Sequence, residues 1–221
     1  MKRTLFATCL LGAMALAGAA SAQTADDDTP VGKQAGTLMV RLRAIGVIPE
    51  DSSSSVSPIG GHVDVSSQAA PEVDFSYFFT DNIAAELIAA TTRHDIQATG
   101  TALGNVSVGT AWVLPPTVTL QYHFFPRERF SPYIGAGLNV SFFYDTSPSK
   151  PIVQSFSLDN SVGAALQVGF DYNFSGHWFA NVDVKQIFVS TTAHINTLLG
   201  PVTARTALNP LVIGAGIGYR F

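Results

Sequence analysis

Eight charged side chains lie in stretches where apolar and polar residues alternate. Successive side chains of a β-strand point to opposite faces, so one face can collect charges while the other stays apolar. If Val162, Leu166 and Phe170 face outward, these charges all point inward, and none falls on an outward face of the central strand segments. The set has four bases and four acids, a balance that favours mutual pairing. Its members, here called the charged floor, are Arg41, Arg43, Lys185, Arg220, Asp74, Glu86, Asp171 and Asp183.

The same inward faces are apolar at the other end of the strands. A surface of this kind binds small apolar molecules rather than ions. We therefore predict an apolar cup above the charged floor, with His123 close to the floor. The predicted lining of the cup is Ile45, Val47, Ile88, Ala90, Phe143, Ile187, Val189, Leu208 and Val212, with Lys185 where cup and floor meet.

Other chemistry is poorly supported. None of the five histidines has H-x-x-x-H spacing, so we expect no metal site. Serines at 52–55 and 57 precede His62, but no G-x-S-x-G motif occurs, so we expect no catalytic residue and no enzyme activity. The Gly-x-Gly pairs at 135/137 and 214/216 lead into no helix, which argues against a nucleotide, and no cofactor is expected.

The first 22 residues have the pattern of a secretory signal peptide. Lys2 and Arg3 form the basic head, residues 5–17 the short apolar core, and Ala20-Ser21-Ala22 the cleavage site, so we expect cleavage after Ala22. Residues 23–36 are expected to be a flexible acidic lead-in, and residues 37–221 a single barrel domain.

The composition favours a chain that lies in lipid. Charged residues are 13% of the chain, against about 25% in soluble domains. No segment after residue 22 is apolar over roughly 18 residues, as a spanning helix requires. Cys9 falls in the predicted signal peptide, which leaves no disulfide. Losing Lys2 and Arg3 takes the formal charge from -4 to -6, and no basic run suggests nucleic-acid binding.

Period-two alternation predicts eight antiparallel strands, the number of a small outer-membrane β-barrel. Short turns are predicted at 80–82, 126–129 and 175–176, and long loops at 49–71, 98–115, 146–159 and 193–205. Short turns at one end and long loops at the other are typical of such barrels, with the short turns in the periplasm. The predicted strands are 37–48, 72–80, 82–97, 116–125, 131–145, 160–175, 177–192 and 206–221.

Aromatic residues gather at the strand ends beside the short turns. Examples are Tyr77, Tyr122, Tyr172 and Trp178, and an aromatic belt at this level would meet the lipid headgroups. A soluble sandwich or lipocalin does not explain this bunching at alternate strand ends. The last strand ends in Tyr219-Arg220-Phe221, which resembles the C-terminal signal recognised by the outer-membrane assembly machinery.

Three inward glycines on the last strand, Gly214, Gly216 and Gly218, neighbour Arg41 and Arg43 on the first strand if the barrel closes. Glycine would leave room for the long arginine side chains to reach the acids. The alternative is that these glycines only relieve crowding and curvature in a small barrel. Both explanations remain open from the sequence.

Five segments together resemble the OmpW family of outer-membrane proteins over essentially the whole predicted mature chain. They are residues 43–49 (RAIGVIP), 80–90 (TDNIAAELIAA), 114–117 (LPPT), 132–139 (PYIGAGLN) and 208–213 (LNPLVI). The resemblance implies an eight-stranded barrel with a narrow, mostly hydrophobic channel that passes small hydrophobic molecules. It also implies a constriction between Ile88 and Lys185, where the family pattern has an aromatic in place of the lysine.

Two functions follow as hypotheses. In the first, a small hydrophobic solute enters the apolar cup, is stopped by the charged floor and leaves sideways into the membrane. In the second, implied by family members that serve as colicin or phage receptors, the lumen is plugged and the loops bind a partner. Trimming the loops around 52–60 and 148–156 is expected to abolish only the second activity. Oligomeric state is not predicted; the expected partners are outer-membrane lipids, hydrophobic solutes and the assembly machinery.

Overall fold

A computed structural model describes residues 32–50, 52–57, 60–102, 104–198 and 200–221. The predicted signal peptide and most of the predicted lead-in lie outside these residues. Within them, no helix is long and apolar enough to cross a bilayer.

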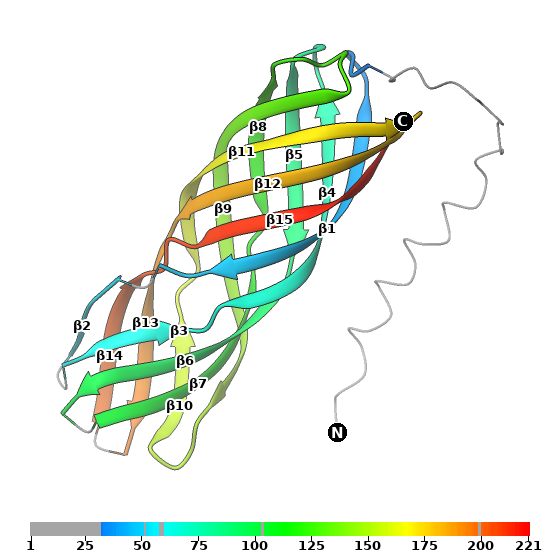
Figure 1. Cartoon of the computed structure of the whole chain (residues 1–221). Helices are drawn as coiled ribbons and strands as arrows, with labels where there is room; N and C mark the ends of the chain where they lie inside the picture. Colours follow the sequence, from blue (N-terminus) through cyan, green and yellow to red (C-terminus); the bar gives the residue numbers. More distant parts are fainter. Residues whose placement is uncertain (1–31, 51, 58–59, 103, 199) are drawn as a thin grey trace.

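Eight antiparallel strands close into a barrel (Figure 1). Each strand pairs with its two neighbours, and the ring closes where β1 pairs with β15 and β9 pairs with β11. The eight-stranded all-β fold predicted from the alternation is therefore confirmed. In ring order the strands are β1 (Leu38–Ile48), β4 (Gln68–Phe78), β5 (Ile83–Ala90), β8 (Thr117–His123), β9 (Phe130–Pro148), β11 (Ser161–Ser175), β12 (Trp178–Phe188) and β15 (Leu211–Arg220).

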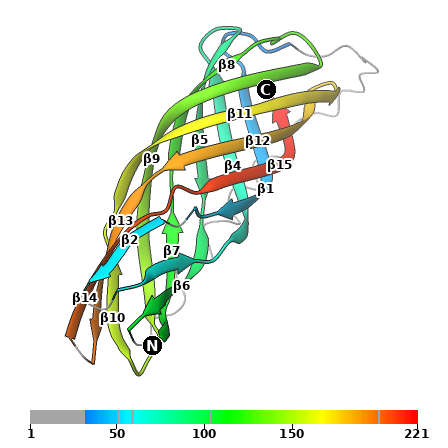
Figure 2. The same ribbon diagram turned by 60° about the vertical axis from the view of Figure 1, so that its left-hand side comes forward.

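The four segments predicted as long loops are mostly β-structure, which corrects the prediction of irregular loops. Beyond the barrel, β9 pairs with β7, and a separate four-stranded sheet has the order β10-β13-β14-β2. Figures 1 and 2 show these strands continuing the barrel at the end opposite the short turns. They are β2 (Ser52–Ser57), β3 (His62–Val65), β6 (Thr92–Thr101), β7 (Gly104–Leu114), β10 (Val153–Leu158), β13 (Ser190–Thr197) and β14 (Gly200–Ala207).

The predicted inside–outside alternation is confirmed on β11, the strand where the pattern is clearest. Val162 is 69% exposed, whereas Gln167 and Asp171 on the other face are buried. All eight charges of the predicted floor are buried as well. An outward charge near the bilayer midplane would cost about 2–4 kcal/mol. The alternation therefore separates an apolar outer wall from a polar interior.

Outward aromatic rings are in contact with one another at the short-turn end of the barrel. Tyr77 packs edge-on against Phe79, with ring centroids 5.4 Å apart, and Tyr219 packs against Phe221 at 4.9 Å. Trp178 adds a third ring to the latter pair, 5.0 Å from Tyr219. The aromatic belt is thus where the sequence predicts it.

The seam between β1 and β15 explains the glycines on the last strand. Gly216 lies opposite Arg43, and Gly218 lies opposite Arg41. A Cβ atom on Gly218 would lie 2.3 Å from the Phe179 ring and 2.9 Å from Arg41 Cγ. A Cβ atom on Gly216 would lie 2.1 Å from the Leu42 carbonyl oxygen and 2.9 Å from Arg43 Cγ. The glycines therefore leave room for the arginine stems, and they also relieve crowding by letting the backbones of β1 and β15 approach each other.

Gly218→Ala is expected to destabilise the barrel by about 1–3 kcal/mol, since the added methyl group overlaps the Phe179 ring and the Arg41 stem. Gly46→Ala is the matched control, because the nearest atom to its added Cβ is 4.0 Å away. Urea unfolding in detergent or lipid measures the free energy of unfolding of both variants. Equal stabilities for the two would contradict this account of the seam.

Candidate functional site: a cavity above an ion-pair floor

Arg41 is the centre of the charged floor. It is fully buried, and its Nη1 donates to Asp74 at 2.7 Å while its guanidinium lies 3.3 Å from Asp171 and 3.4 Å from Glu86. These acids come from β4, β11 and β5, so one side chain of β1 spans the lumen. A buried cation is tolerated only when such partners neutralise it. Arg41 therefore joins strands on different sides of the barrel.

Arg43 and Lys185 extend the ion pairs toward the other end of the barrel. Arg43 lies 2.5 Å from Glu72 and 3.1 Å from Asp74. Lys185 is paired with Asp183, and its Nζ lies 4.0 Å from Glu86. The lysine at the predicted constriction is therefore neutralised by acids and is not a free charge in the channel.

Lys33 is a floor residue that the sequence did not reveal. Residues 23–36 are predicted as a flexible lead-in, yet Lys33 is buried and donates to Asp171 at 2.7 Å and to Ser131 at 2.8 Å. Its ammonium also donates to His123 Nδ1 at 2.9 Å, which leaves the other ring nitrogen to donate to Gln121 at 3.1 Å. His123 thus lies beside the floor, as predicted, but Lys33 corrects the lead-in prediction.

The backbone around Lys33 is held in place at the short-turn end. Lys33 N–H donates to the Pro126 carbonyl at 2.7 Å, and Ala35 N–H donates to Asp81 at 3.2 Å. Arg127 donates to the same carboxylate at 2.9 Å, and these hydrogen bonds hold the pKa of Asp81 below its usual range. The segment therefore closes this end of the barrel.

Two further floor residues, Glu72 and Tyr133, were missed although the alternation marks them. Glu72 has the inward parity of Asp74, and Tyr133 the parity of the other inward residues of β9. The Tyr133 hydroxyl donates to Asp183 at 2.9 Å, and the Arg41 guanidinium lies 5.9 Å from the Tyr133 ring centroid. Both residues could have been found by applying the inward–outward alternation to every residue of each predicted strand.

Arg220 departs from the prediction of a paired network. It is buried, and its guanidinium lies 5.8 Å from the centroid of the Phe179 ring. Among the described residues it makes no ion pair, so its partner is an aromatic face rather than an acid. Within the part of the chain that the structure describes, the ion pairs of the charged floor involve four bases and five acids. Lys33 takes the place of Arg220 among the bases, and Glu72 joins the four predicted acids.

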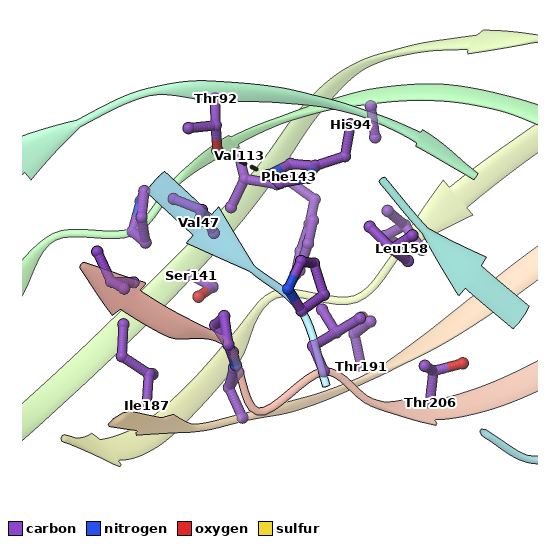
Figure 3. A pocket seen from close by; sticks show the side chains of 18 of the residues that line it. Val47, Thr92, His94, Val113, Ser141, Phe143, Leu158, Ile187, Thr191 and Thr206 are labelled. Carbon is purple, nitrogen blue, oxygen red and sulfur yellow. Dashed lines mark hydrogen bonds between the residues drawn. The ribbon is translucent and has the colours of Figure 1, made fainter. Parts of the chain in front are cut away.

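A cavity of about 110 Å³ lies above the floor, on the side away from the short turns. Figure 3 shows side chains from several strands converging on it, Val47, Phe143 and Ile187 among them. All of the residues predicted to line the apolar cup contribute to its wall: Ile45, Val47, Ile88, Ala90, Phe143, Lys185, Ile187, Val189, Leu208 and Val212. The sequence therefore predicted the position and the apolar character of the cup.

The cup has a cover that the sequence did not predict. A cluster of buried apolar side chains from the strands beyond the barrel packs above it, and we call this the loop-end cluster. Some of its members, such as Ile96 and Ile195, also line the cavity. The cluster consists of Val56, Val63, Ile96, Ala98, Val108, Ala111, Val153, Phe156, Ala193, Ile195, Val202 and Ala204. The cavity thus lies between an ion-paired floor and an apolar cover.

The polar groups of the cavity wall are mostly satisfied by the protein. His94 Nδ1 donates to the Ser66 carbonyl at 2.7 Å, so its Nε2 accepts from the Thr92 hydroxyl at 2.9 Å. Within the described residues, no group of three or more His, Cys, Asp or Glu side chains could hold a metal ion. The wall offers apolar contact and a few hydroxyl groups.

The comparisons with known proteins agree with this architecture. The model of the OmpW family matches residues 34–221. The chain belongs to the OmpW family. An uncharacterised outer-membrane protein of Sinorhizobium fredii, y4mB, is 48% identical over 99% of this chain and 97% of its own. Outer membrane protein W of Vibrio cholerae is 35% identical over 85% of this chain and 90% of its own.

A third relative and a solved structure extend the comparison. The dibenzothiophene metabolism operon protein PahQ of Pseudomonas aeruginosa is 31% identical over 73% of this chain and 76% of its own. The crystal structure of the outer membrane protein OprG from Pseudomonas aeruginosa superposes with a TM-score of 0.81, at 30% identity, over 86% of this chain and 98% of that one. The protein is an OmpW-family barrel of the outer membrane.

Lys33→Ala is expected to destabilise the barrel by about 3 kcal/mol, because it removes one of the two cations, Lys33 and Arg41, that neutralise the buried Asp171. Gln34→Ala changes the exposed neighbouring residue and is expected to have little effect. The free energy of unfolding of both variants, measured in the same lipid, checks this. A Lys33→Ala barrel as stable as the Gln34→Ala barrel would show that the segment is dispensable.

Proposed function

We propose that the barrel takes up small hydrophobic molecules, which bind in the apolar cup and leave sideways into the outer membrane. The observation that carries the proposal is the cavity itself, lined by apolar side chains on the extracellular side of an ion-paired floor. Desolvating such a molecule in an apolar cavity is favourable by roughly 25 cal/mol per Å² of apolar surface removed from water.

The floor supports a route that does not run straight through the barrel. Arg41 and Arg43 are bound to acids on neighbouring and facing strands, and Tyr133 and Phe179 fill the space around them. An apolar molecule that crossed this layer would have to separate buried ion pairs, and unpaired buried charges are costly. A solute in the cup therefore has an easier exit through the wall than through the floor.

At the level of the cup, the pairing between β5 and β8 has come to an end. The pairing of β5 with β8 stops at Ile88 and Thr117, and Thr117 is preceded by Pro115 and Pro116. Proline has no N–H to donate to a neighbouring strand. Pro115 also lines the cavity, so this unpaired stretch belongs to the wall of the cup. We propose it as the exit.

One relative supports the substrate class. PahQ, 31% identical to this chain, is named for an operon of dibenzothiophene metabolism, and dibenzothiophene is an uncharged, apolar aromatic compound. A molecule of that character matches a wall made of aliphatic side chains. The expectation that the barrel has no enzyme activity, cofactor or metal stays a prediction.

Ile187→Asp and Ile88→Asp are expected to weaken binding of a fluorescent aromatic hydrocarbon at least about tenfold, since each places a charge in the wall of the cup. Ser157→Asp adds the same charge on an exposed residue of β10 and is the control. Binding is measured by titration in lipid nanodiscs, and heat-modifiable migration on gels confirms that each barrel has assembled. Unchanged binding in both cup variants would refute a role for the cup.

The receptor hypothesis needs a different test from the one that the sequence suggests. Segments 52–60 and 148–156 carry Val56, Val153 and Phe156, which belong to the loop-end cluster. Trimming these segments would open the cover of the cup and would affect both hypotheses. Substituting exposed residues of the same strands, such as Ser155 and Ser157, leaves the cluster intact and separates a loop-dependent receptor from a solute channel.

A further inference from the structure

Five hydroxyl side chains line the cavity, and four of them are engaged with the protein. Thr92 donates to His94, Thr117 to the Pro115 carbonyl at 3.0 Å, and Ser141 to Asn139 at 2.7 Å. Thr191 donates to the Asp159 carbonyl at 2.7 Å. The remaining hydroxyl, that of Thr206, is the exception.

Thr206 Oγ1 is buried and finds no hydrogen-bond partner among the described residues. Its side chain is 3% exposed and lines the cavity from β14. Thr206 lies directly opposite Thr191 in the pairing of β13 with β14, and Figure 3 shows both side chains at the cavity. Burying a hydroxyl without a partner is unfavourable, and such groups are rare in folded proteins. The position therefore calls for a partner from outside the chain.

The strand pairing beside Thr206 is irregular as well. The register of β14 against β2 shifts between Arg205 and Thr206. Irregularities of this kind are over-represented next to functional sites, where they re-aim a side chain. The shift is a backbone feature and is independent of the missing hydrogen bond.

The charges of the cavity wall indicate that the partner is neutral. Lys185 and Glu72 both line the cavity. The lysine is paired with Asp183, and Glu72 lies 2.5 Å from Arg43. The Glu72 carboxylate would repel an anionic ligand. Lys185 and the Arg43 partner of Glu72 would repel a cationic ligand. A hydroxyl can donate to or accept from an uncharged polar group.

The geometry points to Thr206 as the residue that selects, among small hydrophobic molecules, those with one neutral hydrogen-bonding oxygen, such as a ketone, an ester or an alcohol. This inference rests on the proposed function and narrows its substrate class. The apolar wall of the cup holds the hydrocarbon part of the ligand, and the Thr206 hydroxyl donates to its oxygen. A pure hydrocarbon of the same shape binds without this hydrogen bond.

The test compares 1-indanone with indane, two probes of nearly the same shape that differ by one carbonyl group. Titration into barrels in lipid nanodiscs, corrected for partition into protein-free nanodiscs, gives the ratio of their affinities. The wild-type barrel is expected to prefer 1-indanone by about three- to tenfold, the range of one neutral hydrogen bond. Thr206→Val, which keeps the shape and removes the hydroxyl, is expected to abolish or reverse this preference, because the carbonyl of 1-indanone would then be buried without a partner.

Thr146→Val is the matched control, at a threonine of β9 that is not among the described residues lining the cavity. Its hydroxyl donates to the Phe156 carbonyl at 3.0 Å, so the variant is expected to keep the preference for 1-indanone but to melt at a lower temperature. Thr206→Val is expected to melt at the same temperature as the wild type or higher, since it removes an unsatisfied buried group. A melting temperature lowered as much as in Thr146→Val would count against the inference.

The outcomes separate this inference from the proposed function. If indane and 1-indanone both bind with a ratio that Thr206→Val leaves unchanged, the hydroxyl does not select the ligand and the inference is overturned, while the apolar cup stands. If neither probe binds the wild-type barrel above the partition background, the proposed function fails and the inference fails with it.

Discussion

Charges inside this barrel must neutralise one another, because their side chains are buried away from bulk solvent. Arg41 and Arg43 on β1 satisfy this constraint by reaching acids on β4, β5, β11 and β12. Long side chains that cross the lumen need room on the strand beside them, and the glycines of β15, which pairs with β1, provide it. The ion-paired floor therefore dictates the residues of the seam as well as the obstruction of the lumen.

The floor also determines where an apolar site can exist. Below the level of Glu72 and Lys185 the interior is filled by ion pairs and aromatic rings. Above it the inward residues are mostly apolar, and the loop-end cluster covers them. The apolar cup is thus the space left between two packed layers, and its chemistry follows from the change in inward residue type along each strand.

Much of this could be predicted from the sequence because two environments act on alternate residues. Parity alone placed Glu86, Ile88 and Ile187 inside and Leu87 outside, as the structure has them. It was less informative beyond the barrel, where segments such as 52–57 and 200–207 are rich in Ser, Thr, Gly and Pro, and most of these residues were predicted as loops.

Residues outside the periodic segments could not be predicted in this way. Lys33 precedes the first strand and belongs to an acidic, irregular stretch, so no pattern links it to Asp171, 138 positions away. Thr206 begins the last predicted strand, 206–221, with the inward parity of Leu208, but its missing hydrogen bond is visible only in three dimensions. Arg220 has the right parity, but parity says nothing about whether its neighbour is an acid or an aromatic ring.

The seam has a consequence for how the protein is made. Met39 pairs with Arg220, so the closing contacts join the first and the last strand of the barrel. Such non-local pairing is slow, because the entropy of loop closure is lost before the strand contacts contribute free energy. Until the seam closes, β1 and β15 are open edges that can pair with other chains. Before closure the last strand is therefore an unprotected edge, and a molecule that occupied this edge would keep it from pairing with other chains.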